Sequence, residues 1–177
     1  MAVRGFMMVG LLLAGLAACD AAEKPPGADT SAVAPSGLPT APIVVGGERF
    51  TIELAYEPEA IYRGLGGRAS IDERGGMLFI FPEPAYRQFV MRDCLVPIDI
   101  AYLDGRGEIL DAYTMAVEPP QREGETEAAY NNRLKRYPSR YRATFVLETA
   151  GGTWERLGVG PGDRVEMDVE ALKRLAR

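Results

Sequence analysis

The sequence contains no histidine and only two cysteines among its 177 residues. The absence of histidine excludes every mechanism that needs an imidazole base, including Ser-His-Asp and Cys-His catalysis. It also excludes histidine-ligated zinc, and two cysteines cannot supply the four ligands of an ordinary zinc centre. We therefore expect no metal, no cofactor and no catalytic group of a familiar kind.

Positively charged residues are not in excess either. The chain carries a net charge of −5 at pH 7, so it has no general attraction for nucleic acid phosphates. Basic residues do gather between Arg133 and Arg142, but acidic residues lie just before them. We interpret this segment as a solvated surface and expect no nucleic acid partner.

One long apolar run is present, and it lies at residues 6–18. Arg4 precedes the run, small residues end it, and Cys19 follows, which are the parts of a secretory signal. As a helix the run would span about 20 Å, short of the ~30 Å hydrocarbon core. Its end, Leu16-Ala17-Ala18-Cys19, resembles the lipobox of bacterial lipoproteins, in which the cysteine receives a diacylglyceryl group and the chain is cut just before it.

These features divide the chain into three parts. We predict a signal peptide at 1–18, a lipidated Cys19 with a disordered tether at 19–42, and one globular domain at 43–177. The tether is rich in Ala, Pro, Gly, Ser and Thr, so it cannot bury enough apolar surface to offset the entropy of ordering. The protein would be anchored to a membrane of the bacterial cell envelope through the lipid, with its domain facing the periplasm.

Apolar residues alternate with polar ones from residue 49 to 56, which is typical of a half-buried strand. Residues 77–81 are apolar on both faces and suit a central strand, and Pro82-Glu83-Pro84 follows as a turn. Short turns between strands favour antiparallel pairing. We predict a β-rich α+β fold, a mainly antiparallel, sandwich-like sheet with a few short helices. Further strands are expected at 88–92, 98–103, 108–115, 144–148 and 164–169, and helices at 58–65, 125–137 and 152–157 and at the C-terminus.

Several of these segments resemble one known family. They are Arg63-Gly64-Leu65, Gly76-Met77-Leu78-Phe79-Ile80-Phe81, Phe89-Val90-Met91-Arg92-Asp93-Cys94, Pro97-Ile98-Asp99-Ile100-Ala101-Tyr102-Leu103-Asp104, and the glycines with Asp163 and Val165 in 158–165. Together they resemble the DUF192 family of small bacterial and archaeal domains, from about Phe50 to Val169. The resemblance implies a β-rich, sandwich-like domain and implies no particular reaction. Many relatives have threonine where this chain has Cys94, so an essential thiol is not implied.

Charged residues flank the most distinctive of these segments. We take Arg63, Arg68, Arg92, Asp93 and Asp99 as a candidate binding pocket. Glycines at 66, 67, 75 and 76 allow close backbone approach, so the loop between them could rim a groove for a polar ligand. Glycines that simply form the turns of a surface loop would explain the same pattern.

Asp99 stands in an otherwise apolar strand and is expected to be buried. A buried carboxylate is costly unless it is paired or accepts several hydrogen bonds. We therefore expect an ion pair between Asp99 and one of the three arginines, since the guanidinium fork can bind both carboxylate oxygens.

Three functions stay open at this point. The first is an envelope module that binds a small polar ligand, a glycan or an envelope protein. The second is a hydrolase that uses Asp93 and Asp99, which requires the two carboxyl groups to lie within about 10 Å of each other in one cleft. The third is a purely structural accessory protein.

The lipobox generates a direct prediction. In a bacterial host, Cys19→Ser should abolish acylation and leave an unprocessed precursor, because the modified sulfur and the cleavage signal are lost together. Metabolic labelling with a fatty acid and the mobility of the chain on a gel measure both effects. Labelling that persists in the variant would show that the lipobox interpretation is wrong.

Overall fold

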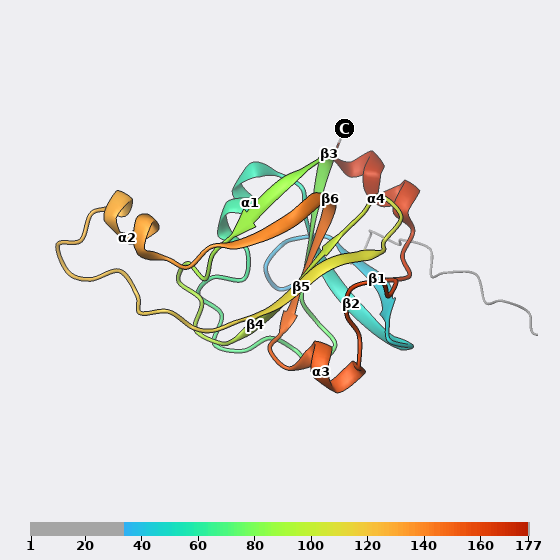
Figure 1. Ribbon diagram of the computed structural model, residues 1–177, viewed down its shortest axis with the longest axis horizontal. Coiled ribbons are helices and arrows are strands. Elements are labelled where there is room, and N and C mark those ends of the chain that lie inside the picture. The colour runs from blue at the N-terminus through green and yellow to red at the C-terminus, as the bar shows by residue number, and fades with distance from the viewer. Residues whose placement is uncertain (1–33, 177) are drawn as a thin grey trace, which may run out of the picture.

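The computed structural model describes residues 34–176; the predicted signal peptide, Cys19 and most of the tether lie outside them. Six strands form a sheet in the order β1-β2-β3-β6-β4-β5 (Figure 1). The strands are β1 (Thr40–Val45), β2 (Glu48–Ala55), β3 (Met77–Phe89), β4 (Ile98–Leu103), β5 (Ile109–Met115) and β6 (Tyr137–Ala150). Strands β2 and β3 are parallel, and the other pairs are antiparallel. The fold is β-rich as predicted, but the sheet is mixed, and a sandwich of two sheets is not confirmed.

Four short helices accompany the sheet in the described part of the chain: α1 (Pro58–Arg63), α2 (Glu127–Arg133), α3 (Thr153–Leu157) and α4 (Val169–Leu175). Helix α2 belongs to an insertion between β5 and β6 that projects from the rest of the domain (Figure 1). Thr126 caps this helix by accepting a hydrogen bond from the Ala129 backbone. Within residues 34–176, no helix is long and apolar enough to cross a membrane.

Strand β6 lies between β3 and β4, and its side chains alternate between two apolar clusters. Phe145 and Leu147 enter the first, which we call the inner core, and Val146 enters the second, the outer core. The inner core is formed mainly by Ile43, Phe50, Ile52, Leu54, Leu78, Ile80, Leu103, Phe145, Leu147, Trp154, Val165 and Leu172. The outer core is formed mainly by Leu65, Met77, Phe79, Met91, Cys94, Ile98, Ile100, Tyr102 and Val146.

Residues 162–167, which we call the closing segment, connect the two edges of the sheet. Val44 and Glu166 exchange two backbone hydrogen bonds of 2.9 Å, and the Val165 N–H donates to the carbonyl of Gly107, just before β5. Gly107 has φ +88°, and a Cβ there would lie 2.6 Å from the Val165 oxygen, so this close approach requires glycine. The closing segment therefore encloses the inner core much as a barrel would, with isolated bridges in place of the strand predicted at 164–169.

Two other segments differ from the sequence prediction, and proline is the reason in both. Strand β1 begins at Thr40, inside the predicted tether, because an edge strand tolerates Pro42, which has no N–H to donate. Pro82 and Pro84 were expected to form a turn that ends a strand. They lie instead within β3, where the register with β6 shifts between Ile80 and Ala85.

Closure by residues 162–167 can be tested with a cross-link. Val44→Cys combined with Glu166→Cys should form a disulfide on mild oxidation, because directly paired strand residues lie within disulfide reach. The bond would close a long loop and raise the free energy of unfolding by about 2–4 kcal/mol. Melting with and without reductant measures the gain, and the single variants serve as controls. A failure to cross-link would contradict the described closure.

Candidate functional site

A cavity of about 390 Å³ opens on the outer-core side of the sheet. Helix α1 and the loop after it form one wall, strand β3 forms another, and β6 contributes Glu148. We call it the Glu148 cavity; its lining includes Tyr62, Arg63, Gly64, Leu65, Phe79, Phe81, Arg87, Phe89, Arg92, Cys94, Asn131 and Glu148. Its volume falls at the small end of the ~300–1,000 Å³ range of ligand pockets.

Glu148 is the most unusual group in this lining. Its side chain is on a central strand, and the residue is only 4% exposed. Within residues 34–176 the carboxyl group has neither a hydrogen-bond partner nor an ion pair, and its oxygens are not fully sealed from the cavity. Burial raises its pKa to about 8, against the opposing charge of Arg68. At neutral pH the group is therefore mostly protonated, so it can both donate and accept a hydrogen bond.

Two glycines lie next to Glu148, one against its backbone and one near its side chain. At Gly76, a Cβ would lie 2.1 Å from the Glu148 carbonyl oxygen, so only glycine allows the chain before β3 to pass so close to β6. At Gly64, where φ is +52°, a Cβ would lie 3.5 Å from Phe79 and 3.9 Å from the Glu148 carboxyl. Both glycines belong to the segments singled out in the sequence, whereas Glu148 was predicted only as the end of a strand.

Cys94 also lines the cavity, and its thiol is mostly buried. Burial raises the pKa of the thiol to about 12, and the charges of Glu148 and Asp93 add to the effect. The thiolate is the nucleophilic form of cysteine, so at neutral pH this group is inert. Cys94 acts here as a packing residue of the outer core.

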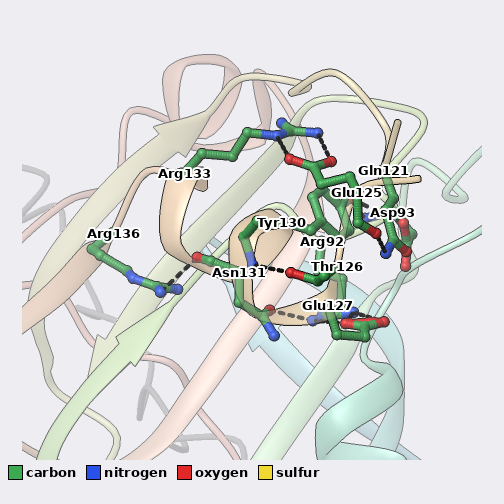
Figure 2. A network of polar contacts seen from close by, with 11 residues as sticks. Arg92, Asp93, Gln121, Glu125, Thr126, Glu127, Tyr130, Asn131, Arg133 and Arg136 are labelled. Atoms are coloured by element: carbon green, nitrogen blue, oxygen red, sulfur yellow. Dashed lines mark hydrogen bonds and ion pairs between the residues drawn. The ribbon is translucent and has the colours of Figure 1, made fainter. Parts of the chain in front are cut away.

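Arg92, a residue of the cavity lining, is the main link between the α2 insertion and the rest of the domain (Figure 2). Both terminal nitrogens of Arg92 donate to Glu127 at 2.9 Å, one also donates to Asn131, and the guanidinium lies about 5 Å from the rings of Tyr62 and Tyr130. A second link joins Tyr130 to the neighbouring residue, Asp93. The Tyr130 hydroxyl donates to the Asp93 carboxylate, and the Asp93 N–H donates to the Tyr130 oxygen, both at 3.0 Å.

The structure brings three of the five candidate residues together. Arg63, Arg92 and Asp93 line a groove of about 500 Å³ that shares Arg63 and Arg92 with the Glu148 cavity. Arg68 lies in an adjacent depression, where its guanidinium donates to both oxygens of Glu53 at 2.5 and 2.8 Å.

Asp99 lies apart from the other four. It is fully buried, as expected, but the predicted ion pair is wrong: no arginine of the described chain reaches it. One carboxylate oxygen accepts a 2.8 Å hydrogen bond from the backbone N–H of Trp154, in the first turn of α3. Gly152 precedes this helix and offers no side-chain cap, so Asp99 satisfies an otherwise free helix N–H. Its side chain faces the inner core, whereas Asp93 faces the α2 insertion, so the two carboxyl groups do not share a cleft.

Arg87 is a cavity residue that the sequence did not reveal. Its guanidinium carbon lies 3.5 Å from the centroid of the Phe81 ring, and one terminal nitrogen donates to the Glu83 carbonyl. Within residues 34–176 it has no carboxylate partner, and its buried Nε–H finds no acceptor. No local pattern signals this arrangement, because it depends on how β3 bends around its prolines.

Comparison with families of known proteins matches residues 41–167 to the DUF192 profile, described as "Uncharacterized ACR". The chain belongs to the DUF192 family. Two solved structures resemble this DUF192 domain. A protein of unknown function from Novosphingobium aromaticivorans is 27% identical with a TM-score of 0.63, covering 76% of this chain and 91% of that one. A putative transcription regulator from Sinorhizobium meliloti is 28% identical with a TM-score of 0.56, covering 76% and 88%. No curated protein matches.

The acidic residues of the DUF192 domain are dispersed. Nowhere in residues 34–176 do three histidine, cysteine or acidic side chains gather in a way that could hold a metal ion. The chemistry that the described cavity offers is therefore that of hydrogen bonds, aromatic faces and guanidinium groups.

Glu148 gives a pH-dependent prediction. Its pKa rises from an ordinary 4.5 to about 8 on folding, so the folded state binds more protons between these values. The contribution of Glu148 to the free energy of unfolding should therefore be greatest below about pH 4.5 and be lost as the pH rises towards 8, with a slope approaching about 1.4 kcal/mol per pH unit. The neighbours Arg68, Cys94 and Tyr102 do not titrate in this window, because the pKa of each is raised.

Urea denaturation of the wild type and Glu148→Gln at several pH values would measure this effect. The difference in unfolding free energy between the two should change between pH 5 and 8 and level off above 8. A difference that is the same at every pH would contradict a buried, protonated Glu148.

Proposed function

We propose that this DUF192 protein is an envelope lipoprotein whose domain binds a small polar ligand in the Glu148 cavity. The observation that carries the proposal is a buried carboxyl group without a partner that lines a cavity. Glu53 shows the contrast within the same domain, since Arg68 and Ser36 both donate to its carboxylate. Glu53 has the contacts of a structural acid, and Glu148 does not.

A buried polar group without a partner costs about 1–3 kcal/mol. An apolar side chain at position 148 would remove that cost and would suit the surrounding outer core. A residue that lowers stability in this way is expected where a ligand completes its hydrogen bonds. The state of Glu148 therefore favours a ligand that offers its carboxyl group a hydrogen-bond donor, an acceptor or both.

Binding is favoured over hydrolysis by the same geometry. Asp93 and Asp99 face different parts of the domain, and the Cys94 thiol has a pKa of about 12. The sequence contains no histidine that could serve as a base. The described lining of the cavity thus offers groups that hold a ligand and no activated nucleophile.

The anchoring half of the proposal rests on the lipobox at Cys19. Strand β1 begins at Thr40, 21 residues after Cys19 (40 − 19). A fully extended chain of that length spans at most roughly 75 Å. A lipid on Cys19 would therefore keep the Glu148 cavity within that distance of the membrane, on its periplasmic side.

Thermal-shift measurements on Glu148→Met test the binding proposal. Without a ligand, the variant should melt several degrees above the wild type, because an unpartnered polar group is replaced by an apolar one of similar length. Probes are N-acetylglucosamine, muramyl dipeptide, and a set of small hydroxy acids with their amides. At least one should stabilise the wild type and lose most of its effect in Glu148→Met, while Glu155→Gln on exposed α3 behaves as the wild type.

The opposite pattern would sink the proposal. If Glu148→Met melts below the wild type and no probe distinguishes the two proteins, Glu148 is a structural residue and the cavity is not a binding site.

A further inference from the structure

The charges that line the Glu148 cavity are unequal. Among the described residues of the lining, three are arginines, namely Arg63, Arg87 and Arg92, and one, Glu148, is acidic. Because Glu148 is mostly protonated at neutral pH, the lining is positive overall. A positive, partly apolar cavity favours a ligand that carries negative charge.

The three arginines differ in how well they are already paired. Arg92 is held by Glu127 and Asn131, and its role is to fasten the α2 insertion. Arg63 is largely exposed and lies 3.7 Å from Glu59. Arg87 has no carboxylate partner in the described chain, and its Nε–H is buried without an acceptor. Arg87 is therefore the arginine that a ligand would complete.

Arg87 and Glu148 lie towards opposite ends of the cavity. Glu148 pairs with Met77 across β3 and β6, whereas the Arg87 guanidinium lies over the ring of Phe81, four residues further along β3. Those four steps along the strand span about 13 Å between backbone positions. Aromatic rings lie along this stretch, including Phe79 and Phe89, which meet edge to face with centroids 4.9 Å apart.

From this arrangement we infer that the Glu148 cavity takes an elongated organic acid, with its carboxylate on Arg87, an apolar body against Phe79 and Phe89, and a hydroxyl group at the Glu148 end. This inference rests on the proposed function and adds the chemical class of the ligand.

Each end of such a ligand satisfies a group that the described chain leaves incomplete. The carboxylate accepts from the Arg87 guanidinium, whose fork can bind both oxygens. The hydroxyl group at the other end accepts a hydrogen bond from the protonated Glu148 carboxyl group and donates one to its carbonyl oxygen. The aromatic rings between them exclude water, which strengthens both polar contacts. Neutral sugars would leave Arg87 unpaired, and short inorganic anions would leave Glu148 unpaired.

Three matched probes separate these contacts: 4-hydroxyphenylacetate, its neutral amide, and phenylacetate, which lacks the hydroxyl group. Saturation-transfer NMR and thermal shift with the purified full chain would rank their affinities. We expect 4-hydroxyphenylacetate to bind at least tenfold more tightly than either analogue. Arg87→Gln should remove the preference for the acid over the amide, and Arg87→Lys should retain part of it. Arg49→Gln, on the exposed face of β2, is the charge-matched control and should change nothing.

The variants also separate this inference from the proposal beneath it. If the neutral amide binds as well as the acid, with an affinity that depends on Glu148 and not on Arg87, the acid inference is overturned and the binding cavity stands. The acid inference is also overturned, and the binding cavity also stands, if none of the three probes binds but N-acetylglucosamine binds in a way that depends on Glu148. If no probe depends on Glu148, both fail together.

Discussion

Strand β6 pairs with β3 on one side and β4 on the other, so its alternation decides which side chains enter each of the two cores. Phe145 and Leu147 pack in the inner core, and Val146 and Glu148 lie on the opposite, outer-core side of the sheet. A slip of one residue would move the Glu148 carboxyl group into the inner core and expel two large apolar side chains from it. The apolar pattern of β6 therefore fixes both the packing of the domain and the place where an acid faces a cavity.

The polar groups of the domain fall into two kinds. Arg68 and Arg92 are satisfied by Glu53 and by Glu127, and each holds one segment against another. Asp99 holds the first turn of α3 through one oxygen, while its other oxygen is buried without a partner. Glu148 has no hydrogen bond or ion pair within residues 34–176, and Arg87 has a buried Nε–H without an acceptor. Both line the same cavity, whereas Asp99 and Thr149, which each keep one buried oxygen without a partner, do not. Groups of the first kind stabilise the fold, whereas those of the second kind lower its stability unless something else binds them. This difference, rather than burial alone, distinguishes a candidate binding group from a structural one.

The sequence predicted much of the sheet but little of the site, for a physical reason. Alternation along residues 49–56 and the apolar run at 77–81 are local, so strands β2 and β3 could be located from them. The burial of Asp99 was equally local, but its partner is the first turn of a helix 55 residues away. Glu148 and Arg87 acquire their significance only when β3, β6 and α1 meet around one cavity, which no neighbouring residue signals.

The closing segment also has a consequence for how the chain folds. Val44 and Glu166 pair although 122 residues (166 − 44) separate them. Contacts over such separations form late, because the loop entropy is lost before the contact compensates for it. The inner core therefore cannot be sealed until residues near the C-terminus have left the ribosome. On the export route proposed above, this delay leaves the chain without a sealed inner core, and so able to cross a membrane unfolded, until its synthesis is nearly complete.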